Sequence, residues 1–121
     1  MKTALIVFAH GSRVESANEA VRTVSAELAR AGGYPLVEAA FLELGRPSLE
    51  EAADLLVGQG AGRLIILPYF LTLGTHMERD LPRLVESISF KNKGLQISVA
   101  PPLDGHPGLI QALRERADAF L

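Results

Sequence analysis

The chain has 121 residues, enough for one domain with one core and too few for two domains of ordinary size. Apolar residues make up 48% and charged residues 21% of the chain, a balance typical of a folded globular protein rather than of a disordered one. The formal net charge of -2 excludes a general attraction to nucleic acid or to an anionic membrane. Because there is no cysteine, disulfides and thiolate ligands are excluded, and we expect any metal to be held by nitrogen or oxygen within a single domain, residues 1–121.

Four apolar runs rich in β-branched or aromatic residues predict buried strands, and they cover residues 3–9, 36–42, 63–70 and 95–100. Each run is followed by a segment with helical spacing, at 14–31, 49–58, 82–90 and 107–121. This alternation predicts an α/β fold with a four-stranded parallel sheet, right-handed crossovers and helices that cover the sheet. No run approaches the ~20 residues needed to span a bilayer, and the first is not followed by a signal-peptide cleavage site, so we expect a cytoplasmic protein.

Two helix starts carry the pattern of a capping box, in which two side chains satisfy otherwise unpaired amide groups. Ser12 is followed three residues later by Glu15, and Ser48 is followed at the same spacing by Glu51. We therefore expect both serines to cap the helices that follow them.

The segment after the third predicted strand contains two conflicting signals. Thr75 and Glu78 also have the spacing of a capping box, but a helix that began at Thr75 would contain Pro82, at a cost of about 3 kcal/mol. The prediction is therefore a helix that begins near Pro82, with Asp80 close to its cap and His76 on the turn before it.

Three side chains that can bind metal follow the ends of successive strands. His10 follows the first strand, Glu43 the second and His76 the third. Because the carboxyl ends of parallel strands meet at one edge of the sheet, we expect these side chains to lie on one rim. Two imidazoles and a carboxylate suit cobalt, iron, nickel or zinc, and three protein ligands leave coordination positions open for a substrate.

Each of these residues also has a purely structural interpretation. His10 could satisfy nearby backbone groups beside the tight turn that Gly11 permits, and Glu43 could be the solvent-facing residue of a strand end. His106 precedes a proline at a predicted helix start, which accounts for it, although its strand-end position keeps it as a candidate beside the metal ligands.

Basic side chains flank the three candidate ligands. Arg13, Arg46 and Arg79 can bind carboxylates in bidentate fashion, so together with Ser12 they are candidates for holding an acidic substrate. The alternative is that each arginine is an ordinary solvated surface residue.

Several short motifs occur between the first predicted strand and the last predicted helix: His10-Gly-Ser-Arg13, Phe41-Leu-Glu-Leu44, Pro47-Ser48, Pro68-Tyr-Phe-Leu71, Gly74-Thr-His76, Asp80-Leu-Pro82 and Pro102-Leu-Asp-Gly-His-Pro107. The most specific are the His-Gly-Ser start and the Gly-x-His-x-x-x-Asp-x-Pro segment. With these motifs the chain resembles the short-form sirohydrochlorin cobaltochelatases, which are class II tetrapyrrole chelatases.

The resemblance implies a Rossmann-like chelatase fold without nucleotide binding, and an ATP-independent lyase that inserts a divalent metal into sirohydrochlorin. It maps the metal-binding histidines of the family onto His10 and His76 and its metal-binding acid onto Glu43. Cobalt is the expected metal, and iron or nickel are alternatives because related enzymes insert them with the same ligands. Long-form relatives carry two such domains in one chain, so we expect this chain to work as a homodimer with its cleft between two rims.

Two other functions compete with metal insertion. A histidine phosphatase-like phosphotransferase would use His10 and Arg13, but it needs an arginine directly before the histidine, where this chain has Ala9. A metal carrier or sensor could use the same three ligands without catalysing any reaction.

Overall fold

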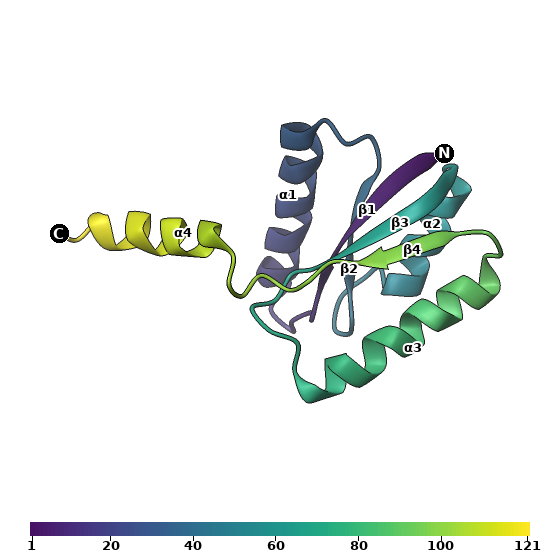
Figure 1. Cartoon of the computed structure of the whole chain (residues 1–121). Helices are drawn as coiled ribbons and strands as arrows, with labels where there is room; N and C mark the ends of the chain where they lie inside the picture. The colour runs from purple at the N-terminus through teal and green to yellow at the C-terminus, as the bar shows by residue number, and fades with distance from the viewer.

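The computed structural model describes all 121 residues, which form four strands and four helices in strict alternation (Figure 1). All strands are parallel and lie in the order β2-β1-β3-β4, so the predicted α/β fold is confirmed. No helix is both long and apolar enough to cross a membrane. The elements are β1 (Lys2–Ala9), α1 (Glu15–Gly32), β2 (Val37–Phe41), α2 (Leu49–Gly58), β3 (Ala61–Pro68), α3 (Thr75–Lys91), β4 (Gln96–Val99) and α4 (Pro107–Asp118).

The core lies on both faces of β1, because successive side chains of a strand point to opposite faces. Ile6 and Phe8 belong to the larger apolar cluster, which α2 and α3 cover. Val7 and Ala9 belong to the smaller cluster on the opposite face, under α1. Burial on both faces explains why β1 has an unbroken apolar sequence from Ala4 to Ala9. The central strand therefore ends in a fixed position and presents His10 at the carboxyl edge of the sheet.

The start of α3 differs from the prediction. The helix begins at Thr75 with Gly74 as its N-cap, Pro82 lies inside it, and neither Thr75 nor Asp80 makes a capping bond. His76 consequently lies in the first turn of a helix, not on a turn before one. The predicted start near Pro82 is wrong.

Burial explains why the helix continues through the proline. Met77, Leu81 and Ile88 are at most 5% exposed and form one stripe that packs on the sheet from both sides of Pro82. Burying an apolar side chain of this size stabilises the fold by about 1.5–3 kcal/mol, so Met77 and Leu81 together outweigh the ~3 kcal/mol cost of an internal proline.

The two expected capping boxes have different outcomes. At α2 the Ser48 hydroxyl accepts a hydrogen bond from the Glu51 amide (3.2 Å), and the Glu51 carboxylate accepts one from the Ser48 amide (2.8 Å), which confirms the prediction. At α1 the N-cap is Val14, which makes no side-chain capping bond, so the box predicted from Ser12 is wrong. Because Ser12 lies two residues before the cap, its hydroxyl accepts only the Val14 amide (3.0 Å).

The position of α4 is the main departure from the predicted architecture. The helix leaves the carboxyl edge of β4 and points away from the body of the molecule, where the sequence predicts a helix that covers the sheet (Figure 1). No residue of α4 is buried, and the helix contacts no other helix or strand. The expectation that four helices cover the sheet is wrong for this one.

Candidate functional site

His10 and Glu43 form a pair at the carboxyl edge of the sheet. Because β1 and β2 are hydrogen-bonded neighbours in register up to Ala9 and Phe41, the residues just beyond them are brought together. His10 Nε2 lies 3.2 Å from Glu43 Oε1, and the two side chains are 60% and 58% exposed. An open imidazole and carboxylate can bind a divalent cation or accept a proton from a bound molecule.

The loop after β1, which carries His10, and the loop after β2, which carries Glu43, approach each other closely at Gly11. The Glu43 amide donates a hydrogen bond to the His10 carbonyl (3.1 Å). Gly11 has a φ of 98°, and a Cβ at this position would lie 1.7 Å from the Glu43 carbonyl oxygen. Only glycine permits this approach, so Gly11 sets the spacing of His10 and Glu43.

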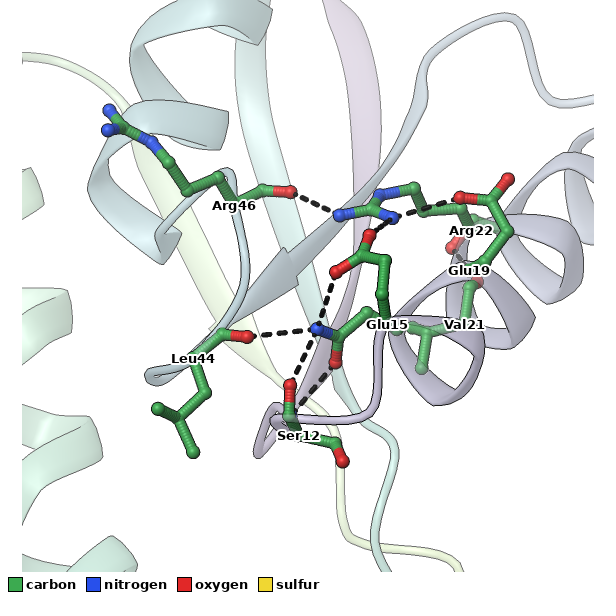
Figure 2. Close-up of polar contacts among 9 residues, drawn as sticks. Ser12, Glu15, Glu19, Val21, Arg22, Leu44 and Arg46 are labelled. Carbon is green, nitrogen blue, oxygen red and sulfur yellow. Dashed lines mark hydrogen bonds and ion pairs between the residues drawn. The ribbon is translucent and has the colours of Figure 1, made fainter.

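Asn18, on α1, joins the same two loops through hydrogen bonds. It is 1% exposed, and its amide group donates to the carbonyls of Ser12 and Leu44, both at 2.9 Å. Its Oδ1 accepts the Ser12 amide at 2.9 Å (Figure 2). Because a buried amide side chain loses its hydration, these bonds hold Asn18 and both loops in one arrangement.

A second α1 side chain holds the far end of the Glu43 loop. Arg22 donates to the Arg46 carbonyl (3.0 Å) and forms ion pairs with Glu15 (2.7 Å) and Glu19 (2.9 Å), as Figure 2 shows. The Arg22 and Asn18 hydrogen bonds lower the pKa of Glu15 below its ordinary value. Glu15, predicted as part of a capping box, therefore orients Arg22 instead.

His76 lies on the same rim but apart from the His10–Glu43 pair. Its Nδ1 is 3.1 Å from Nη2 of Arg79, one helical turn further along α3. A guanidinium only donates hydrogen bonds, so Nδ1 is the acceptor and a neutral His76 carries its proton on Nε2. No group of three histidine or carboxylate side chains is close enough to hold a metal ion together.

The three arginines proposed to hold a substrate have different surroundings. Arg46 forms an ion pair with Glu51, and Arg79 lies 3.3 Å from Asp80. Arg13 is exposed and forms no ion pair. The Ser48 amide, and then Arg46, lower the pKa of Glu51. Of the three, Arg13 alone needs to break no ion pair in order to bind an anion.

His106 is the N-cap of α4, and its Nδ1 accepts the Gly108 amide at 2.8 Å. This contact confirms the interpretation of His106 as part of a helix start and gives it a structural role that does not involve a metal.

Asn18 is a part of the site that was not predicted from the sequence. The signal is present in the spacing, because Asn18 lies on the helix stripe that also contains Val21, Ser25 and Leu28. A lone polar amide on the core-facing stripe of a helix must find hydrogen-bond partners inside the protein.

Curated relatives are similar in sequence to this chain over most of its length. The chain is 33% identical over 117 residues to the sirohydrochlorin cobaltochelatase of Sulfolobus acidocaldarius, a match that covers 97% of this chain and 91% of that protein. It is 33% identical over 112 residues to the chloroplastic sirohydrochlorin ferrochelatase of Arabidopsis thaliana, covering 93% of this chain and 50% of the relative. The chain thus spans half of one relative and nearly all of the other.

Comparison with solved structures leads to the same group of proteins. The chain superimposes on the CbiX protein from Marinobacter aquaeolei VT8 with a TM-score of 0.83 and 26% identity, covering 97% of this chain and 95% of that one. The match to the sirohydrochlorin chelatase SirB from Bacillus subtilis subspecies spizizenii in complex with cobalt has a TM-score of 0.87 and 27% identity, over 99% of this chain and 51% of SirB. A family model described as CbiX matches residues 4–119. The chain therefore belongs to the CbiX family.

Proposed function

We propose that the protein is a metal chelatase that inserts a divalent metal ion, cobalt in the first place, into sirohydrochlorin. The observation that carries the proposal is the open His10–Glu43 pair, held at the carboxyl edge of the sheet in a chain of the CbiX family. Relatives are named as a cobaltochelatase and a ferrochelatase, and solved relatives contain cobalt or Fe3+, so iron is the principal alternative and nickel a further one.

Insertion releases two protons, because the two inner N–H groups of the tetrapyrrole are replaced by bonds to the metal. We propose that the His10–Glu43 pair accepts the first of these protons. The His10 imidazole is exposed and can accept a proton, and the Glu43 carboxylate 3.2 Å away stabilises the resulting imidazolium. His76 is the proposed third metal ligand. The hydrogen bond from Arg79 to His76 Nδ1 must break before the imidazole can ligate, because ligation through Nδ1 uses that lone pair and ligation through Nε2 moves the ring proton to Nδ1.

The same rim supplies candidates for binding the acidic groups of the substrate. Arg13 forms no ion pair and can bind a substrate carboxylate directly. Arg46 would first have to release Glu51, and Arg79 would have to release Asp80. Ser12 is the weakest candidate, since its hydroxyl already accepts the Val14 amide. We expect the reaction to need no nucleotide and to take place in the cytoplasm.

An open pair on one rim offers a platform rather than an enclosure for a tetrapyrrole. We therefore propose that two copies associate with their rims facing each other, which encloses the substrate and provides two sets of His10, Glu43 and His76. Light scattering at the concentration of the activity assay tests this arrangement, since full activity of a monomer across a dilution series would exclude it.

Mixing the protein with sirohydrochlorin and cobalt, iron or nickel tests the function, with the tetrapyrrole absorption spectrum as the readout. We expect His10→Ala and His76→Ala each to abolish the accelerated insertion while the fold is kept. His106→Ala is the matched control, because it removes the third histidine of the chain, whose contact is with the α4 backbone. Metal binding without accelerated insertion in the wild type would indicate a carrier and overturn the chelatase proposal.

A further inference from the structure

Leu44, directly after Glu43, has a backbone conformation that does not suit its side chain. Its φ is 58°, and no other residue apart from glycines has a positive φ. In this left-handed region the Cβ of an L-residue is crowded by the following carbonyl oxygen, whereas glycine and, to a lesser degree, asparagine are tolerated. The chain therefore keeps a leucine where glycine or asparagine would be less strained.

The hydrogen bond that holds this conformation does not depend on the leucine. The Leu44 carbonyl accepts the side-chain amide of Asn18 at 2.9 Å, and any residue at position 44 would offer the same carbonyl. The Leu44 side chain points away from α1, on the other side of the backbone from this bond (Figure 2). The contact with Asn18 thus explains the turn and leaves the choice of side chain unexplained.

Packing within the chain does not explain the leucine either. Leu44 is 51% exposed, and it belongs neither to the two core clusters nor to the apolar residues packed against them. A polar side chain at this position would therefore cost no core burial. Strained residues of this kind persist where the surrounding structure holds them, and they gather at binding and catalytic sites.

The other loops of the rim also carry exposed apolar side chains. Val14, in the loop after β1, is 61% exposed, and Leu71, in the loop after β3, is 62% exposed. Arg13 directly precedes Val14, and Arg46 follows Leu44 by two residues. Single exposed apolar residues are common, but here three loops at one edge of the sheet each carry one, two of them beside a guanidinium group. This combination suits a flat ligand that is apolar at its centre and acidic at its periphery.

We infer that Leu44 is a substrate-binding residue, whose side chain packs against the macrocycle while the adjacent Glu43 binds the metal. Insertion places the centre of the macrocycle over the ion that Glu43 holds. Adjacent Cα atoms are only about 3.8 Å apart, so a tetrapyrrole centred there also covers Leu44. The exposed half of the leucine then loses its contact with water, which favours binding. The inference rests on the proposed function and adds to it a residue that binds the macrocycle without ligating the metal.

Substitution of Leu44 separates binding of the macrocycle from binding of the metal. Leu44→Asn suits the backbone and removes the apolar contact, Leu44→Gly is a second variant that does the same, and Leu44→Met keeps an apolar side chain. The matched control is Leu55→Asn, since Leu55 is 46% exposed and lies in the second half of α2, which runs back from the rim. Metal-free sirohydrochlorin is titrated into each protein with absorption as the readout, and cobalt affinity and the melting temperature are measured separately.

We expect sirohydrochlorin to bind Leu44→Asn and Leu44→Gly roughly 4- to 10-fold more weakly than wild type, and to bind Leu44→Met and Leu55→Asn within about twofold of wild type. Cobalt affinity should be unchanged in all four variants, because Glu43 and both histidines are kept. The melting temperature of Leu44→Asn should be no lower than that of wild type, because the left-handed position is relieved.

Three results would overturn the inference. Wild-type affinity for sirohydrochlorin in both Leu44→Asn and Leu44→Gly would show that the leucine makes no contact with the macrocycle. An equal loss in Leu55→Asn would show that the effect is not local to the rim, and a parallel loss of cobalt affinity would mean that Leu44 only positions Glu43. In each case sirohydrochlorin still binds the wild type, so the proposed function stands. A wild-type protein that does not bind sirohydrochlorin would instead overturn the proposed function, and the inference with it.

Discussion

Gly11→Ala is the sharpest test of how the site is built. The new Cβ would lie 1.7 Å from the Glu43 carbonyl oxygen, whereas real contacts of this kind essentially never fall under 3.0 Å. The two loops must therefore separate by about 1.3 Å, which breaks the 3.1 Å hydrogen bond from the Glu43 amide to the His10 carbonyl. The side chains of His10 and Glu43 are carried apart with their backbones.

Gly33→Ala is the matched control, because Gly33 also has a positive φ (67°) but has nothing within 4 Å of its Cβ position. Both variants have the cost of a left-handed alanine, about 1 kcal/mol. Gly11→Ala adds the lost hydrogen bond and the strain of the displaced loops, together about 2 kcal/mol more.

At ~4 °C per kcal/mol, we expect a melting temperature about 4 °C below wild type for Gly33→Ala and about 12 °C below for Gly11→Ala. A displacement of about 1 Å at a reacting group typically lowers rates ~100-fold, so metal insertion should fall steeply in Gly11→Ala alone. Calorimetry and the insertion assay on both variants decide the matter. Equal melting temperatures together with equal insertion rates would refute the close approach at Gly11.

Three further variants test the rest of the site. Asn18→Ala leaves the Leu44 carbonyl and both Ser12 backbone groups without partners and should cost about 2 kcal/mol in denaturant unfolding, and Asn18→Asp, which keeps only the acceptor, should not rescue it. Glu43→Gln keeps an oxygen ligand and loses the charge, so steady-state kinetics should show a lower rate with cobalt affinity partly retained. Because the folded pKa of Glu51 is lowered from 4.5, its stabilising effect is present above pH 4.5 and is lost as the pH falls further; Glu51→Gln should therefore lower the melting temperature more at pH 7 than at pH 3.

The sheet could be predicted from the sequence because strands that are buried on both faces have continuous apolar sequences. β1 is covered on both faces, so every residue from Ala4 to Ala9 is apolar and the run has no helical period. The alternation with helices then determines the parallel arrangement. The rim position of His10 and Glu43 follows from that topology, since each comes just after a strand, whereas His76 lies in the first turn of α3, beyond the loop that follows β3.

What could not be predicted depends on contacts between distant parts of the chain. The internal Pro82 is tolerated because Met77 and Leu81 are buried against the sheet, and the local sequence does not reveal how deeply they are buried. The apolar residues of α4 predict a helix packed on its own sheet, but α4 contacts no other helix or strand. Local patterns therefore located most of the elements and missed the start of α3 and the position of α4.

The His10–Glu43 pair and His76 differ in whether residues far away in the sequence hold them in place. Such residues hold the pair, and no hydrogen bond from a distant residue holds His76. His10 and Glu43 are close because a glycine contact and two α1 side chains, Asn18 and Arg22, fix the loops on which they stand. His76 has no such support, since it stands in the first turn of α3 and the hydrogen bond of its ring is with the exposed Arg79. Under the proposed function, the fixed pair is the side of the rim that accepts protons as well as binding metal, whereas His76, the proposed third ligand, keeps freedom to move when the metal passes to the tetrapyrrole. Support by Asn18 and Arg22 of α1, rather than the choice of ligand residues, is thus what distinguishes the two sides of the rim.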